Sequence, residues 1–170
     1  MLSGGLRYFL PQDAANISTE LQKKISAAQL TLKSKRTDQR NLLSEAQQQG
    51  YALAFNRQQL AQQQHLPVLG LFASSAMDDA IYASQNPDSA QPDLNELTRK
   101  ALQLLGTSER GFFLMVEGGQ IDWAAHNNDA GALLHELLRF DAAIQEVVNW
   151  AADRDDTLVV LTADHETGGF

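Results

Sequence analysis

Three residues that could do chemistry lie close together near position 120. Glu117 comes directly after the apolar run 112–116, and Asp122 and His126 follow it. Because Asp122 and His126 are four residues apart, one helical turn would place the carboxylate and the imidazole on the same side. Oxygen and nitrogen ligands of this kind suit zinc, or zinc beside a harder ion such as magnesium. The spacing therefore favours a metal site just after a strand.

A second acid–histidine pair lies about forty residues further along the chain. Asp164 and His165 come shortly after the apolar run 158–161. Such runs are typical of buried parallel strands, and an open α/β sheet places its active groups just beyond the carboxyl ends of its strands. We therefore expect the two groups of residues to converge around one cavity.

Each candidate ligand also has an ordinary structural explanation. Glu117 alone could be a solvated loop residue. Asp122 and His126 could be a pair on a helix surface. Asp164 and His165 could belong to a turn. Their coincidence at two strand ends, among small residues that leave room for ions and substrate, favours metal binding. A site with two or three ions suits phosphoryl or sulfuryl transfer, because two ions ~4 Å apart can hold the entering and leaving oxygens.

The elements that must position these residues alternate between helices and strands. This alternation predicts an α/β fold, a layered α/β/α arrangement with a mainly parallel sheet flanked by helices, in a single domain over 1–170. A peripheral helix is predicted over 13–33 and a surface loop over 78–91. The other predicted elements are helices at 41–50, 58–65, 92–106 and 129–152 and strands at 51–55, 67–72, 112–116 and 158–161.

The helix predicted over 129–152 has the longest periodic pattern in the chain. Asn128 or Asp129 can cap its start. His135 lies off the apolar stripe, so we expect it on the surface. The residues expected to be buried along the stripe are Leu133, Leu134, Leu137, Phe140, Ile144, Val147 and Val148.

Composition and charge exclude several classes of function. The chain of 170 residues has a formal net charge of −8, which argues against binding to a nucleic-acid backbone. No apolar run approaches the ~18 residues that a membrane-spanning helix needs. There is no cysteine, so disulfides say nothing about the compartment. The one cationic stretch, 33–40, lacks an accompanying aromatic or glycine-rich element, and a solvated loop explains it better than a phosphate site.

The two stretches that hold the candidate ligands resemble the metal motifs of alkaline phosphatases. Residues 116–126 read Val-Glu-Gly-Gly-Gln-Ile-Asp-Trp-Ala-Ala-His, and residues 161–169 read Leu-Thr-Ala-Asp-His-Glu-Thr-Gly-Gly. Both are similar to the family's pattern and occur in the same order, and weaker similarity extends over 4–9, 40–51 and 67–72. The resemblance implies hydrolysis of phosphate monoesters through a serine or threonine phospho-enzyme intermediate, with two zinc ions and one magnesium ion.

The same resemblance implies a metal for each candidate ligand. Glu117 resembles the carboxylate of the magnesium site. Asp122 and His126 resemble two ligands of the first zinc, and Asp164 and His165 resemble two ligands of the second.

Three neighbouring residues are less defined by the resemblance. Trp123 would line the substrate side near the phosphate, and a half-buried packing aromatic explains it equally well. Glu166 and Thr167 occupy positions where other members of the family carry different residues. We therefore assign them no role from the sequence.

The resemblance also implies what the chain lacks. The family's nucleophile would lie upstream and a further zinc-binding histidine downstream, so we expect an internal fragment with no catalytic residue, weak zinc binding and no useful turnover. Family members are commonly exported, which implies a periplasmic or extracellular location, and a homodimer is compatible with the family. Two other functions stay open: a phosphodiesterase or phosphomutase of the same superfamily, and a metal-free interaction module in which the helix over 13–33 docks a partner.

Overall fold

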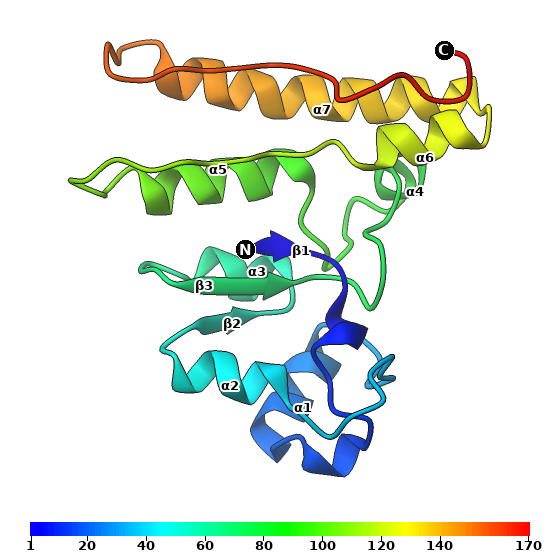
Figure 1. Ribbon diagram of the computed structural model, residues 1–170, viewed down its shortest axis with the longest axis vertical. Coiled ribbons are helices and arrows are strands. Elements are labelled where there is room, and N and C mark those ends of the chain that lie inside the picture. The colour runs from blue at the N-terminus through cyan, green and yellow to red at the C-terminus, as the bar shows by residue number, and fades with distance from the viewer. The chain divides into compact units, whose positions relative to one another are not determined.

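The computed structural model describes residues 1–170 and shows an α/β chain with one parallel sheet (Figure 1). Backbone contacts divide the chain into two compact units, residues 1–78 with 88–92 and residues 79–87 with 93–170. The first unit contains the sheet and three α-helices, and the second contains four α-helices. The predicted α/β class with a parallel sheet is confirmed. None of the helices combines the length and the apolar character that a membrane crossing requires.

Three short strands form the sheet of the first unit. The central strand, β3, is buried at every residue, as its apolar run predicts. The sequence does not predict β1, because two residues carry no readable period, yet Leu2 pairs with Gly70 of β3. The strands are β1 (Leu2–Ser3), β2 (Ala52–Ala54) and β3 (Val68–Leu71), in the order β1-β3-β2 and all parallel.

The helices of the first unit enclose a single apolar core. The helix predicted over 13–33 is too long, because Ser18 caps a new helix and Gln29 takes a φ of 58° after it. Its apolar face is nonetheless buried in the unit's own core, with Leu21 2% and Ile25 0% exposed. That face is therefore already used within the unit. The helices are η1 (Leu6–Tyr8), η2 (Ala14–Asn16), α1 (Thr19–Ala27), α2 (Leu42–Gln48) and α3 (Arg57–Ala61).

In the second unit, one long helix, α7, packs against the other three. The surface loop predicted over 78–91 contains a short helix, α4, because the Asp79 side chain accepts a hydrogen bond from the Tyr82 amide and caps it. The helix predicted from Pro92 begins two residues later, where Asp93 and Glu96 form a capping box. The helices of this unit are α4 (Ala80–Gln85), α5 (Leu94–Leu105), α6 (Gln120–His126) and α7 (Ala130–Ala151).

The buried face of α7 differs from the predicted stripe. Leu134, Leu137 and Val148 are 57%, 46% and 48% exposed, so their predicted burial is wrong. The buried residues are Glu136 and Ala143, because Glu136 turns inward to accept a hydrogen bond from the Ala80 amide at the start of α4. The helix is thus rotated relative to its apolar period. His135 is exposed, as expected.

The strands predicted at 112–116 and 158–161 do not form. Both segments belong to no sheet, so α7 does not connect two strands of one sheet. Several of their apolar side chains are open to solvent, with Phe113 89%, Leu158 86% and Val160 73% exposed. The physical reason is that an apolar run sets the preference for an extended conformation, whereas a ladder also needs the backbone of a neighbouring strand.

Candidate functional site

Helix α6 presents an acid and an imidazole on its accessible side. Its small residues Ala124 and Ala125 are buried, and α6 packs against α7. The spacing of four residues places Asp122 Oδ1 3.6 Å from His126 Nε2, with the two side chains 38% and 67% exposed. The pair predicted from the i, i+4 spacing is therefore present and open to a ligand.

A glycine allows the segment before α6 to approach α7 closely. A Cβ atom on Gly118 would lie 2.9 Å from the Ile121 side chain and 3.0 Å from the Phe140 ring of α7. The side chain of Glu117, just before this glycine, is exposed, and the structure does not join it to the Asp122–His126 pair. Glu117 thus lies near α6 in sequence without being part of the pair.

The second acid–histidine pair lies on the C-terminal segment. His165 Nε2 is 3.5 Å from Asp164 Oδ2, and the backbone amide of His165 donates to Asp164 Oδ1 at 3.1 Å. The other ring nitrogen, Nδ1, lies 2.9 Å from the Glu166 carbonyl oxygen. That carbonyl, and secondly the charge of Asp164, raise the pKa of His165 above its usual value.

Thr167 joins the two pairs. Its hydroxyl donates to Asp122 Oδ1 at 2.7 Å and lies 3.1 Å from His165 Nδ1. Gly168 makes this contact possible: it has a φ of +71°, and a Cβ atom there would overlap the Ala125 carbonyl oxygen of α6. The C-terminal segment accordingly returns to α6 (Figure 1). Residues 45 positions apart are thereby brought together.

The two pairs fit a zinc ion in the type and spacing of their donor atoms. Two ligands that bind a tetrahedral zinc at ~2.1 Å stand ~3.4 Å apart. The separations within the two pairs, 3.6 Å and 3.5 Å, are close to this value. No three His, Asp or Glu side chains are grouped closely enough to hold one ion. Each pair therefore offers two of the four ligands that such an ion uses.

The sequence names the acids and histidines of the two pairs as candidate ligands but gives Thr167 no role. The available signal was a hydroxyl two residues after His165 and directly before two glycines, one of which allows the close approach to α6. Trp123 lies on α6 between the two residues of the first pair and is 53% exposed. Its expected position on the substrate side stays a prediction.

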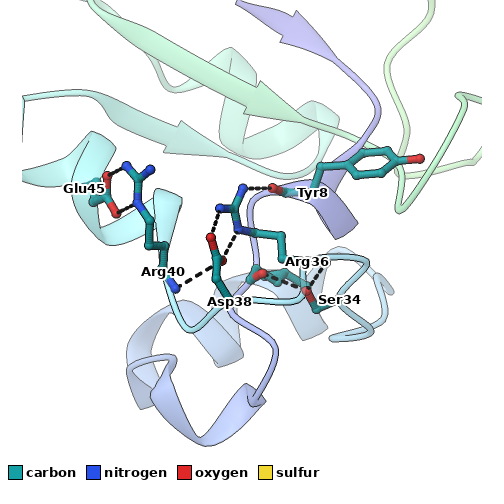
Figure 2. Close-up of polar contacts among 7 residues, drawn as sticks. Tyr8, Ser34, Arg36, Asp38, Arg40 and Glu45 are labelled. Carbon is teal, nitrogen blue, oxygen red and sulfur yellow. Dashed lines mark hydrogen bonds and ion pairs between the residues drawn. The ribbon is translucent and has the colours of Figure 1, made fainter.

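The cationic stretch 33–40 lies in the first unit, and two of its four basic residues pair with neighbouring acids. Figure 2 shows the Arg36 guanidinium bonded to Asp38 and that of Arg40 bonded to Glu45. These hydrogen bonds hold the pKa values of both carboxyl groups below their usual range. An open hollow of about 280 Å³ lies beside it. The pairing supports a charged surface loop more than a phosphate site.

Comparison with known proteins finds sequence relatives that are alkaline phosphatases. The family model of alkaline phosphatase matches residues 1–170. Alkaline phosphatase 4 of Bacillus subtilis is 42% identical over 131 residues, which cover 77% of this chain and 28% of that protein. The membrane-bound alkaline phosphatase of Bombyx mori is 37% identical over 174 residues, covering 97% of this chain and 29% of that protein. The chain thus spans less than a third of the length of these relatives.

Solved structures agree with the sequence relatives. The alkaline phosphatase of Thermus thermophilus matches with a TM-score of 0.79 and 28% identity, over 98% of this chain and 30% of that chain. A mutant of the TAB5 alkaline phosphatase with Mg bound in its M3 site matches with a TM-score of 0.69 and 28% identity, over 99% of this chain and 40% of that chain. Because the family model matches this chain from residue 1 to residue 170, the chain belongs to the alkaline phosphatase family.

Proposed function

We propose that this chain supplies part of the metal centre of a phosphomonoesterase that hydrolyses phosphate monoesters. The observation that carries the proposal is the pair of acid–imidazole half-sites, Asp122–His126 and Asp164–His165, linked by Thr167. Their donor atoms and spacing fit zinc, and the relatives of the chain are alkaline phosphatases. The centre would use two zinc ions and one magnesium ion.

The assignment of ligands follows the two half-sites. Asp122 and His126 would hold one zinc ion, and Asp164 and His165 would hold the second. The exposed carboxylate of Glu117, which lies outside both pairs, would serve the magnesium ion, because magnesium prefers oxygen ligands. Each ion would need further ligands from residues that we have not assigned.

The chemistry of the centre depends on how these side chains are held. When bound, the metal ions supply positive charge that stabilises the entering and leaving oxygens of a phosphoryl transfer. The residues of the chain present the ligand atoms: the turn of α6 aligns Asp122 with His126, and the Thr167 hydroxyl holds Asp122 beside His165. We assign no nucleophile within residues 1–170. In the proposed mechanism, a serine or threonine elsewhere in the enzyme would form the phospho-enzyme intermediate.

Neither alternative function gains support from a specific contact. The interaction-module hypothesis needs the apolar face of α1, and that face is buried in the core of the first unit. Phosphodiesterase or phosphomutase activity would use the same metal ligands, and the relatives named above are phosphatases. We further propose a periplasmic or extracellular location and a homodimeric enzyme, by analogy with the family.

Zinc titration by calorimetry tests the proposed site directly. The chain should bind zinc weakly, because each pair offers only two ligands, and should show no turnover of a phosphate monoester. Asp122→Ala and His165→Ala should each weaken zinc binding by about tenfold or more. His135→Ala is the matched control, since that histidine is exposed on α7 and outside both pairs.

Two results would contradict the proposal in different ways. Tight stoichiometric binding, or hydrolysis by the chain alone, would show that the centre is already complete within these residues. Zinc binding that is equally strong in Asp122→Ala, His165→Ala and His135→Ala would show that the two pairs are not the site.

A further inference from the structure

The hydrogen bonds around His165 determine which of its two ring nitrogens carries the proton. Nδ1 lies 2.9 Å from the Glu166 carbonyl oxygen, an atom that can only accept a hydrogen bond. It also lies 3.1 Å from the Thr167 hydroxyl. A neutral imidazole has one donor and one acceptor nitrogen, and its partners decide which is which.

The hydroxyl of Thr167 has only one hydrogen to give. That hydrogen is directed to Asp122 Oδ1 at 2.7 Å, and a carboxylate oxygen accepts. The hydroxyl therefore faces His165 Nδ1 as an acceptor. The Glu166 carbonyl and the Thr167 hydroxyl thus both require a hydrogen on Nδ1, which leaves the lone pair of the neutral ring on Nε2.

The ring nitrogen that keeps the lone pair, Nε2, is the one that faces Asp164. His165 Nε2 lies 3.5 Å from Asp164 Oδ2, the spacing expected for two ligands of one zinc ion. We propose that Thr167 is a positioning residue that holds His165 in the Nδ1–H tautomer and ties its half-site to Asp122 of the other. This inference rests on the proposed function for its purpose, whereas the tautomer itself does not depend on metal.

The position of Thr167 is itself fixed by the neighbouring backbone. Gly168 takes a left-handed φ and lies against the Ala125 carbonyl oxygen, where no side chain fits. The Thr167 side chain is half-buried, in contrast to the exposed His165 and Asp164. Thr167 is therefore the least exposed residue of the tail, residues 158–170, and its hydroxyl has a partner on each side.

The test compares Thr167→Val, which removes the hydroxyl at nearly constant shape, with Thr167→Ser, which keeps it. Long-range ¹H–¹⁵N correlation spectra of the metal-free chain report the tautomer. They are recorded at a pH above which the His165 ring shifts no longer change, so that the ring is neutral, because the pKa of His165 is raised above the ordinary ~6.5. The unaltered chain and Thr167→Ser should show the Nδ1–H form. Thr167→Val should shift His165 towards the Nε2–H form. Thr162→Val controls for loss of a tail hydroxyl that bonds only the Ala163 carbonyl.

Zinc titration of the same variants separates this inference from the proposed function. Thr167→Val should weaken zinc binding by about 10–100-fold, with recovery in Thr167→Ser. Absence of zinc binding in the unaltered chain would refute the proposed metal site but leave the tautomer result valid. An Nε2–H tautomer in the unaltered chain, or identical spectra for Thr167→Val and the unaltered chain, would overturn the positioning role of Thr167.

Discussion

Apolar segments of similar composition form a buried strand in the first unit and stay outside any sheet in the second. In the first unit, the run 67–72 becomes the central strand β3, and Leu71 is fully buried. In the second unit, the runs 112–116 and 158–161 stay outside any sheet, and Leu158 is 86% exposed. The candidate ligands follow these two exposed runs. The unit that carries the site is therefore the one whose apolar side chains are less completely covered.

This difference shows that the apolar pattern and the pairing of a strand are separate properties. The pattern makes burial favourable, at ~25 cal/mol per Å² of apolar surface removed from water. Pairing requires a second backbone at the correct register, which the segment itself does not specify. Exposed apolar segments with free backbone groups are also sites where another strand can bind.

The largest expected effect comes from truncating one leucine in each unit. Leu71→Ala should lower the free energy of unfolding by ~2–5 kcal/mol, because it leaves a cavity in the core. Leu158→Ala makes the same chemical change in an exposed side chain and should alter it by no more than ~0.5 kcal/mol. Urea denaturation of both variants measures the contrast. A loss for Leu158→Ala equal to that for Leu71→Ala would mean that residues 158–161 are covered in solution.

A second pair of variants tests how the tail of the second unit is held. Gly168 and Gly169 both have positive φ, +71° and +89°, but only at Gly168 would a Cβ atom meet the Ala125 carbonyl oxygen. Gly169→Ala should cost only the left-handed strain of ~1–2 kcal/mol. Gly168→Ala should cost more and release the tail from α6. Hydrogen exchange of the amides at 163–170 measures both, and equal protection in the two variants would show that the tail does not rest on α6.

Sequence reasoning succeeded where the determinants of structure are local. The start of α2 follows from the Asn41 side chain, which accepts a hydrogen bond from the Ser44 amide. One of the two caps proposed for α7, Asp129, is the observed one. The Asp122–His126 pair follows from helical spacing alone. Each of these features depends on residues within one turn of each other, so their order in the chain is sufficient.

Sequence reasoning failed where the determinants are distant in the chain. Glu136 looks like a solvent-facing residue of α7, but its partner is the Ala80 amide, 56 residues earlier. The Thr167 hydroxyl donates a hydrogen bond to Asp122, which lies 45 residues earlier in the chain. The absence of a ladder at 112–116 and 158–161 likewise depends on which backbones lie nearby. Such contacts leave no period or spacing that one sequence can reveal.

The smallest expected effect concerns two glutamates on α7 whose pKa values move in opposite directions. Burial is the main cause that raises the pKa of Glu136 above its usual 4.5, and the charge of Asp79 adds to the rise. The hydrogen bond from the Ala80 amide and the charges of Arg139, 3.9 Å away, and His135 lower the pKa and oppose this rise. The Arg99 guanidinium is the main cause that lowers the pKa of Glu146 below 4.5. Since a folded state with a raised acid pKa binds more protons than the unfolded chain, the contribution of Glu136 falls as pH rises above about 4.5. Since the opposite holds for Glu146, its contribution to stability is lost as pH falls below about 4.5.

Glu136→Gln keeps an oxygen that can accept from the Ala80 amide. It should flatten the decline in stability above pH 4.5 and stabilise the chain at neutral pH. Glu146→Gln should remove the loss of stability at acid pH and should destabilise the chain at neutral pH by less than ~1 kcal/mol. Urea denaturation across this pH range measures both, and a Glu136→Gln variant that is less stable at neutral pH than the unaltered chain would show that the hydrogen bond from Ala80 and the Arg139 charge outweigh the cost of burying the carboxylate.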